Sequence, residues 1–261
     1  MKKPLSIILL VGVMLLFSSF TFGAMTGREA HERYIYPIVR ITTTGSSGSG
    51  TVIYSNNGVT YVLTNYHVIE NAVNIVTKWD SDKQKEVKEE VRSTVYVEIF
   101  KYRDLSTPIG TLKVEADVEK YNKAEDMAIV RLRMVESVEY VAILLPRNKI
   151  DTLYVMDETV AVGCSLLLPP LPTVGVITRK NVEIDSFPYY MSSSQVIYGN
   201  SGGAMFLAKT GELIGIPSRG TVIGWGTPIT HMGFFIPIER IYRWLVNVGI
   251  MVEKEMEKGV E

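Results

Sequence analysis

The chain has 261 residues, of which 46% are hydrophobic and 21% are charged, and its 27 Lys and Arg against 28 Asp and Glu give a formal net charge of −1. This composition excludes a disordered tail and does not favour nucleic-acid binding, because disordered chains are poor in hydrophobic residues and nucleic-acid-binding domains are usually basic. The single cysteine, Cys164, excludes an intramolecular disulfide framework. The length suits one large β or α/β domain, or two small barrels that share an interface.

The first element along the chain is an uncharged stretch at residues 4–27, which follows Lys2 and Lys3 and has its apolar centre at residues 5–17. A short basic region followed by an apolar run is the pattern of an export signal. Two alternatives stay open: cleavage after Gly23, or retention of residues 4–27 as a membrane anchor, because about 20 apolar residues can span a bilayer. In both cases the body of the protein is expected to be exported.

From residue 36 onward the sequence predicts many short strands separated by turn residues. Asn56-Asn57-Gly58 predicts a hairpin turn, and the glycine- and serine-rich residues 44–50 predict a flexible loop. The predicted strands are 36–42, 51–54, 59–64, 95–102, 112–118, 127–134, 159–163, 174–178, 195–198, 204–208, 212–216 and 232–236. Because few helical periods separate them, the pattern favours antiparallel barrels or sandwiches over alternating strands and helices.

Two segments differ from the strand pattern. Residues 78–92 are rich in charge and predict a solvated helix or the tip of a hairpin. Pro237 predicts the start of a C-terminal helix with one apolar face. The apolar positions of that helix are Ile238, Ile241, Trp244, Leu245 and Val248. Its charged residues Glu239, Arg240 and Arg243 are expected on the surface.

The segment that most strongly indicates chemistry is Gly199-Asn200-Ser201-Gly202-Gly203. A serine hydroxyl becomes a nucleophile only when a base removes its proton, and the resulting oxyanion needs N–H donors aimed at it. Glycines beside the serine let the chain bend so that N–H groups converge. A glycine-rich turn also occurs without any catalytic role, so a base and an acid are required to support this hypothesis.

Three histidines are available, and His67 is the best candidate for the base. His31 is expected in a solvated lead-in, and His231 in a turn between two late strands. His67 follows a strand at a short helical turn, while Asp126 stands immediately before an apolar strand. A carboxylate there would be partly buried and could accept a hydrogen bond from one ring nitrogen of His67. The order His67, Asp126, Ser201 therefore predicts a catalytic triad.

Two other hydrolytic classes fit less well. The segment around Ser201 also satisfies G-x-S-x-G, the nucleophile elbow of α/β hydrolases, but that fold requires the order serine, acid, histidine. Only Glu212 lies between Ser201 and His231, and the alternation of strands and helices is missing. Metalloprotease chemistry is disfavoured because the sequence contains no H-E-x-x-H motif.

Together, these motifs resemble the trypsin-like (chymotrypsin-fold) serine proteases, and most closely the protease domain of bacterial HtrA/Deg-type peptidases, without a PDZ domain. The segments that carry the resemblance are residues 48–53, 64–68, 126–130, 199–203 and 234–237. The likeness runs from about residue 34 to residue 248 and is poor over residues 71–120. It implies an all-β fold of two six-stranded antiparallel β-barrels with a C-terminal helix. The expected domains are a signal peptide or N-terminal anchor at 1–27, the protease domain at 34–250 and a tail at 251–261.

The resemblance also implies roles for individual residues. His67 and Asp126 would come from the first barrel and Ser201 from the second, with the site in the cleft between them. Ser201 would attack the scissile carbonyl, His67 would move the proton, and Asp126 would orient the imidazole. The oxyanion hole would be formed by the backbone N–H groups of Gly199 and Ser201. No metal or organic cofactor is expected.

Specificity is expected to depend on residues 195–198 and on the strand segment 215–219. By resemblance, the candidate substrate-binding residues are Gln195, Tyr198, Gly215 and Ile216. Gln195 occupies the region where trypsins carry an aspartate, which argues against a preference for Lys or Arg and favours small or aliphatic residues before the cut.

Departures from the family restrict the expectations further. Asn200 is neutral where digestive relatives carry an aspartate that pairs with a new N-terminal amine, so activation by that ion pair is not expected. The prediction is an exported serine endopeptidase acting on proteins or peptides through an acyl-enzyme, with no nucleic-acid partner, possible membrane association through residues 4–27 and an undetermined oligomeric state. The alternative is a catalytically silent binding or scaffold protein on a protease fold, anchored in the membrane.

Overall fold

The computed structural model describes residues 25, 27–224 and 226–250. The predicted leader or anchor at 1–27 therefore lies outside the described residues except for Met25 and Gly27, and the predicted tail at 251–261 lies wholly outside them. Within the described part of the chain, no helix is long and apolar enough to cross a membrane.

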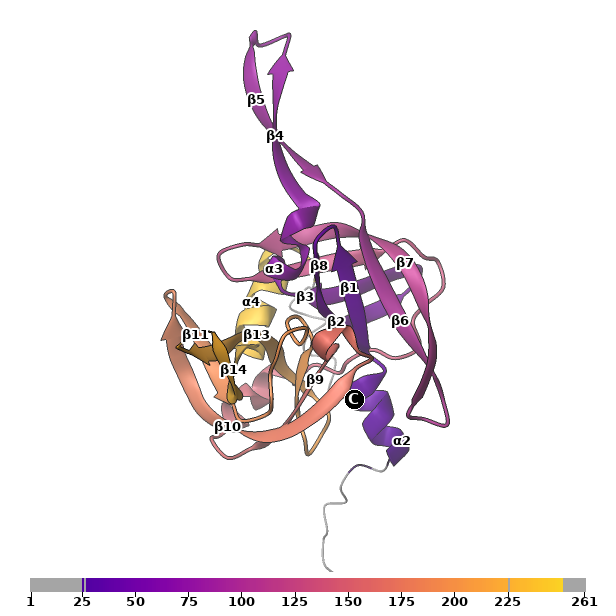
Figure 1. Cartoon of the computed structure of the whole chain (residues 1–261), viewed down its shortest axis with the longest axis vertical. Helices are drawn as coiled ribbons and strands as arrows, with labels where there is room; N and C mark the ends of the chain where they lie inside the picture. The colour runs from indigo at the N-terminus through magenta and orange to yellow at the C-terminus, as the bar shows by residue number, and fades with distance from the viewer. Residues whose placement is uncertain (1–24, 26, 225, 251–261) are drawn as a thin grey trace, which may run out of the picture.

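The first half of the chain closes into a six-stranded antiparallel barrel with the strand order β1-β2-β3-β8-β7-β6 (Figure 1). Its strands are β1 (Ile38–Thr43), β2 (Ser46–Asn56), β3 (Val59–Thr64), β6 (Val95–Arg103), β7 (Thr107–Asn122) and β8 (Met127–Leu132). Asn57 and Gly58 join β2 to β3 with φ values of 49° and 74°. Positive φ at both central positions is what a type I′ hairpin turn requires, so the predicted hairpin is confirmed.

The predicted flexible loop at residues 44–50 is wrong, because β2 begins at Ser46 and pairs with β1 from Thr43↔Ser46 to Ile38↔Thr51. The glycines of this segment serve close packing. A Cβ on Gly50 would lie 2.5 Å from a methyl of Val62 and 2.7 Å from one of Ile41. Tertiary pairing therefore overrides the low strand propensity of these glycines and serines.

The second half forms another closed barrel with the strand order β10-β11-β14-β13-β12-β9, so the predicted all-β fold of two six-stranded barrels is confirmed. Its strands are β9 (Glu158–Gly163), β10 (Leu171–Ile184), β11 (Phe187–Ser192), β12 (Ala204–Leu207), β13 (Leu213–Ile223) and β14 (Thr227–Pro237). Three details differ from the sequence prediction. The sequence does not predict β11, residues 195–198 are irregular and end in a turn in place of a strand, and His231 lies inside β14.

The two barrels meet through apolar side chains. Ile38, Leu63, Met127 and Ile129 belong to strands of the first barrel, yet they cluster with the core of the second and are at most 1% exposed. Leu63 is followed by the end of β3, and Met127 begins β8. The residues just beyond these two points therefore lie at the edge of the barrel interface, where the predicted His67 and Asp126 are found.

Short helices connect the strands, and a longer one closes the chain. They are α2 (Gly27–Ala30), η1 (His31–Ile35), α3 (Tyr66–Ile69), η2 (Glu70–Ala72), η3 (Arg147–Thr152), η4 (Ser165–Leu167) and α4 (Ile238–Asn247). α4 begins directly after Pro237, as predicted, and Ile238, Ile241 and Leu245 on its apolar face have no exposed surface. The expectation that Arg240 lies on the surface is wrong, since its side chain is only 1% exposed.

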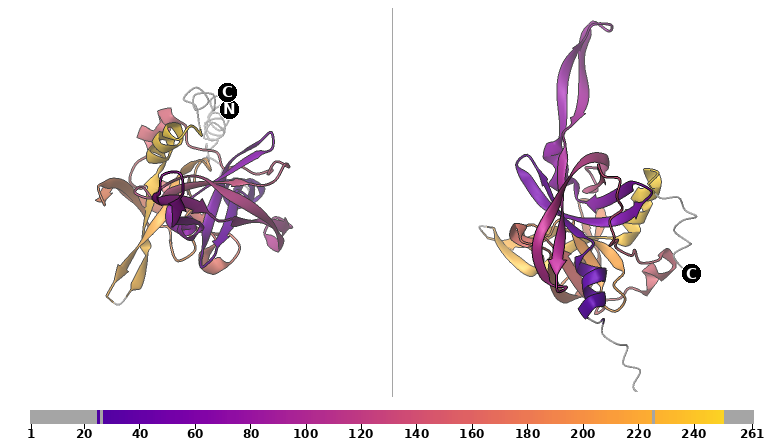
Figure 2. Two further views of the ribbon diagram at one scale, coloured as in Figure 1. Left: turned by 90° about the horizontal axis from the view of Figure 1, so that it is seen from above. Right: turned by 90° about the vertical axis from the view of Figure 1, so that its right-hand side faces the viewer.

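A two-stranded hairpin projects away from the first barrel, as two different views show (Figures 1 and 2). It consists of β4 (Val73–Asp80) and β5 (Lys85–Arg92), paired from Val73↔Arg92 to Asp80↔Lys85. Of the two alternatives for the charged segment 78–92, the hairpin is therefore the one observed. At its base, Arg92 Nη1 donates to Val118 O at 2.7 Å and fastens the hairpin to β7.

Candidate active site

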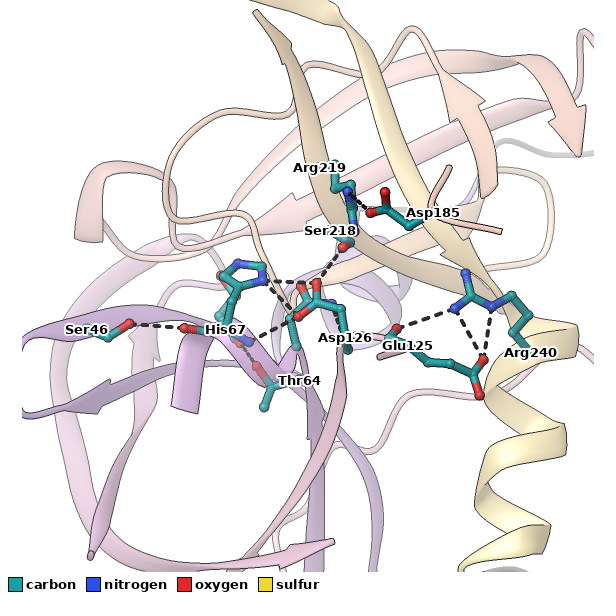
Figure 3. A network of polar contacts seen from close by, with 11 residues as sticks. Ser46, Thr64, His67, Glu125, Asp126, Asp185, Ser218, Arg219 and Arg240 are labelled. Carbon is teal, nitrogen blue, oxygen red and sulfur yellow. Dashed lines mark hydrogen bonds and ion pairs between the residues drawn. The ribbon is translucent and has the colours of Figure 1, made fainter. Parts of the chain in front are cut away.

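His67 and Asp126 are in direct contact. His67 lies in α3, just after β3, and its Nδ1 is 2.9 Å from Asp126 Oδ2 and 3.0 Å from Oδ1. The backbone N–H of His67 also donates to Asp126 Oδ1 at 3.0 Å (Figure 3). The imidazole is 42% exposed while the Asp126 side chain is 12% exposed. A shielded carboxylate thus contacts one ring nitrogen of an imidazole that is partly exposed to solvent, which is the arrangement that a histidine base requires.

Asp126 is held by side chains from both barrels, through its carboxylate and through its backbone carbonyl. Ser218 on β13 donates its hydroxyl to Asp126 Oδ2 at 2.6 Å (Figure 3). From the first barrel, Asn65 Nδ2 donates to the backbone carbonyl of Asp126 at 2.9 Å. Ser218 was not predicted as a site residue, and no local motif marks it, because its partner is 92 positions away in the sequence. The structure adds it to the candidate site.

Ser201 lies in a tight turn between β11 and β12, and the surrounding glycines are required by space. Gly199 and Gly202 have φ values of 97° and 79°, which favour glycine. A Cβ on Gly199 would overlap Cys164 O, and one on Gly202 would overlap the hydroxyl of Thr64. The turn is therefore shaped by close approach to the residues around it, including those of the first barrel.

Ser49 on β2 fastens this turn to the first barrel. Its backbone N–H donates to Ser201 O at 2.8 Å, and its hydroxyl donates to Gly199 O at 2.6 Å. The same hydroxyl accepts from Cys164 N at 2.7 Å, and Ser49 has no exposed surface. The sequence motif at residues 48–53 contains Ser49, but a contact 150 positions away could not be read from it. Ser49 is the second functional residue that sequence reasoning missed.

Asn200, the residue before Ser201, is held by neutral hydrogen bonds. Its Oδ1 accepts from Ser165 Oγ at 2.6 Å and from Ile197 N at 3.3 Å, and the residue is fully buried. Two neutral donors therefore anchor the residue before Ser201. In the described chain, the Nδ2 of Asn200 has no hydrogen-bond partner.

Ser201 and His67 approach each other across Gly48. A Cβ on Gly48 would lie 2.7 Å from a methyl of Val68, the neighbour of His67, and 3.1 Å from Ser201 O. The helix that carries His67 and the turn that carries Ser201 thus pack against the same point of β2. Within the described residues, no hydrogen bond joins the Ser201 hydroxyl to the His67 ring, a contact that often tightens only when substrate binds.

The backbone near Ser201 leaves N–H groups available. Tyr198 O accepts from Leu166 N at 2.8 Å. Because the C=O and N–H of a planar trans peptide point in opposite directions, the Gly199 N–H is directed away from Leu166. Among the loop and turn hydrogen bonds of the described residues, neither Gly199 N nor Ser201 N is a donor. Both could therefore donate to a bound carbonyl oxygen.

The predicted substrate-binding residues separate into two groups. Gln195 and Tyr198 are exposed, and Tyr198 retains 74% of its surface. Gly215 and Ile216 lie in the core of the second barrel, where Ile216 has no exposed surface and pairs with Ile236. The structure therefore buries Gly215 and Ile216 in the wall of the second barrel, whereas it leaves Gln195 and Tyr198 exposed.

The remaining histidines have other surroundings. His31 Nε2 is 2.8 Å from Ser106 Oγ, and His231 is exposed on β14. Neither belongs to the cluster formed by His67, Asp126 and Ser218. The geometry leaves His67 as the histidine that faces a buried carboxylate.

A family model described as a trypsin-like peptidase domain matches residues 48–216. The chain is 28% identical over 192 residues to the periplasmic serine endoprotease DegP of Salmonella typhimurium, covering 69% of this chain and 33% of that protein. It is 25% identical over 205 residues to the serine protease Do-like HtrA of Lactococcus lactis, covering 74% of this chain and 42% of that protein. The chain thus spans between about a third and two fifths of the length of these relatives.

Solved structures show the same fold. The HtrA-type protease AlgW with a tripeptide aligns with a TM-score of 0.62 and 20% identity, over 86% of this chain and 64% of that one. At this identity the likeness concerns the fold, whereas the family model covers more than half of the sequence. The chain belongs to the trypsin-like peptidase family.

Proposed function

We propose that the protein is an exported serine endopeptidase that cuts peptide bonds through His67, Asp126 and Ser201. The observation that carries the proposal is the contact of His67 Nδ1 with both carboxylate oxygens of Asp126, at 2.9 and 3.0 Å. Membership of the trypsin-like peptidase family supports it, as do relatives named serine endoproteases.

The reaction begins with a neutral His67 whose Nδ1–H donates to Asp126. This leaves the Nε2 lone pair free to take the proton of Ser201 as its oxygen attacks the scissile carbonyl. Asp126 stays ionised and stabilises the imidazolium that forms. The imidazolium then protonates the leaving amine, and an acyl-enzyme remains on Ser201. Water, deprotonated by His67, hydrolyses that ester and restores the free serine.

The oxyanion formed in each half-reaction would be bound by the N–H groups of Gly199 and Ser201. One such donor typically stabilises the transition state by about 3 kcal/mol. The hydrogen bonds from the Ser49 N–H to Ser201 O and from the Ser49 hydroxyl to Gly199 O support this role, because they restrain the peptide group that follows each donor. Preorganised donors need no reorientation during the reaction.

Polypeptide substrates are supported by the surface beside the proposed oxyanion hole. Leu166, Leu167 and Leu168 are 63%, 47% and 49% exposed, and Tyr198 is 74% exposed. The hydrogen bond from Leu166 N to Tyr198 O places these apolar side chains next to Gly199. An extended chain with apolar side chains would bury this surface on binding.

A preference for small or aliphatic residues before the cut is supported by Val196. It follows Gln195 in the predicted pocket segment, is 6% exposed and packs directly against Gly233, where an added Cβ would lie 2.6 Å from its methyl. Where Val196 contacts a substrate side chain, it would present a branched aliphatic surface. Gln195 supplies no negative charge to pair with Lys or Arg.

Export is supported by the apolar segment that follows Lys2 and Lys3 and by relatives named periplasmic. In this proposal residues 1–27 direct the chain across the membrane, as a cleaved signal or as an anchor, and residues 34–250 form the protease domain. The partners are protein or peptide substrates, and the proposed chemistry requires no cofactor.

The proposal is tested with a fluorophosphonate, which reacts covalently with an activated serine. We expect wild-type protein to be labelled on Ser201 and to cleave casein, and we expect Ser201→Ala to do neither. His67→Ala should lose both activities while remaining folded by circular dichroism. Folded wild-type protein that neither reacts nor cleaves casein would contradict the proposal and favour a silent binding protein on a protease fold.

A further inference from the structure

Arg240 on α4 is a buried charge. Its side chain is 1% exposed, and arginine is almost never buried to this degree unless it is paired. The guanidinium lies 4.7 Å from the ring centroid of Phe187 and 4.9 Å from that of Tyr189. The second barrel therefore encloses this cation between two aromatic rings next to the barrel interface.

The partner of this cation is Glu125, the residue immediately before Asp126. Arg240 Nε and Nη2 each donate to Glu125 Oε2 at 3.2 Å, and Nη2 also donates to Glu125 O at 3.4 Å (Figure 3). The remaining terminal nitrogen, Nη1, donates to Pro188 O at 3.2 Å. One guanidinium thus ties the turn between β7 and β8 of the first barrel to α4 and to β11 of the second.

Glu125 is also hydrogen-bonded to Asn122 within its own turn. Its Oε1 accepts from Asn122 Nδ2 at 3.1 Å, while its backbone N–H donates to Asn122 Oδ1 at 3.1 Å. Arg240 occupies the other carboxylate oxygen. Both oxygens of Glu125 are therefore engaged, one with the beginning of the turn and one with the second barrel.

Asp126 has a backbone conformation that needs such restraint. Its φ is 56°, in the left-handed region that residues with a side chain adopt infrequently. Conformations of this kind persist when the surrounding structure determines them. The neighbouring contacts are those of Arg240 with Glu125 and that of Asn65 with the carbonyl of Asp126.

We propose that Arg240 and Glu125 are positioning residues for catalysis. The pair holds the turn that carries Asp126 against the second barrel, so that the acid of the first barrel stays in register with His67 and with Ser218 and Ser201. This inference rests on the proposed function. It assigns the C-terminal helix a part in the reaction through a residue whose side chain is only 1% exposed.

The test compares Glu125→Gln with a matched control on α4. Glutamine keeps the shape of glutamate and an acceptor oxygen but removes the charge that Arg240 pairs with. The control is Glu239→Gln, because Glu239 forms an exposed pair with Arg243 at 3.6 Å. We expect Glu125→Gln to lower kcat on a peptide substrate about 10- to 100-fold, the loss typical of small displacements of catalytic groups, with KM within about twofold of wild type. Arg240→Lys should act in the same direction, and the control should match wild type.

A second measurement separates positioning from general stability. In an Asp126→Asn background, Glu125→Gln should cause no further loss in the rate of fluorophosphonate labelling, because its effect passes through Asp126. An equal fold-loss in both backgrounds would overturn the inference, and so would an unchanged kcat in the single variant. Wild-type protein that is not labelled would contradict the proposed function itself. Melting temperatures recorded in parallel verify that all rates refer to folded protein, and a folded Glu125→Gln suffices if Arg240→Lys does not fold.

Discussion

Replacing Ser49 with alanine tests how the first barrel holds the turn that carries Ser201. The Ser49 hydroxyl donates to Gly199 O at 2.6 Å and accepts from Cys164 N at 2.7 Å. Alanine removes both hydrogen bonds but keeps the backbone contact between Ser49 N and Ser201 O. The variant therefore isolates the contribution of one buried hydroxyl.

The expected cost follows from the two groups that lose a partner. The Cys164 N–H lies in a fully buried residue, and leaving a buried donor unsatisfied costs about 1–3 kcal/mol. Losing the partly buried hydrogen bond to Gly199 O adds about 1 kcal/mol. The free energy of unfolding should fall by about 2–4 kcal/mol, which lowers the melting temperature of a domain of this size by about 10 °C.

The reactivity of Ser201 should decrease as well, because Gly199 O belongs to the loop that presents the proposed oxyanion donors. We expect the rate of fluorophosphonate labelling at 25 °C to drop about 10-fold in Ser49→Ala, by the loss of preorganisation. The matched control is Ser47→Ala on the same strand, since within the described residues no hydrogen bond is found for the Ser47 hydroxyl. A melting temperature and a labelling rate equal to those of the control would refute this account of Ser49.

Three further variants or conditions probe neighbouring contacts. Gly202→Ala should lower the free energy of unfolding, measured by urea denaturation, by more than about 2 kcal/mol, because the residue has φ 79° and an added Cβ would overlap a hydroxyl. The control Gly110→Ala places its Cβ in open space and should leave the free energy of unfolding unchanged. Ser218→Ala removes the 2.6 Å bond to Asp126 and should lower kcat about 10-fold at unchanged KM. Burial raises the pKa of the Cys164 thiol from 9.0 to about 12. Its contribution to stability is therefore complete below pH 9 and is lost as pH rises from 9 to 12, and iodoacetamide at pH 8 should alkylate it in urea but not in the native state.

The barrels could be predicted because their signals are local. Alternating apolar residues mark most strands, Asn57-Gly58 is a turn that few other sequences form as readily, and Pro237 precedes the last helix. The candidate site could be predicted from short motifs for the same reason, since His67 follows a recognisable strand and Asp126 immediately precedes one.

The missed features depend on contacts between distant parts of the chain. Ser49 acts on residues about 150 positions away, and Ser218 on a residue 92 positions away. Arg240 looked like a surface residue because its helical neighbours are charged, but Glu125 and two aromatic rings provide a buried partner that its own helix does not reveal. Glycine and serine disfavour strands and therefore predict a loop at residues 44–50, whereas pairing with β1 makes residues 46–50 part of a strand.

The most direct test of the account is the pre-steady-state hydrolysis of an activated ester, which reveals an acyl-enzyme as a burst of released alcohol. We predict a burst of about one equivalent per chain in wild-type protein and none in folded Ser201→Ala, with His67→Ala slowing the burst by several orders of magnitude. A folded wild-type protein that shows no burst, or a burst that persists in Ser201→Ala, would contradict the assignment of Ser201 as the nucleophile.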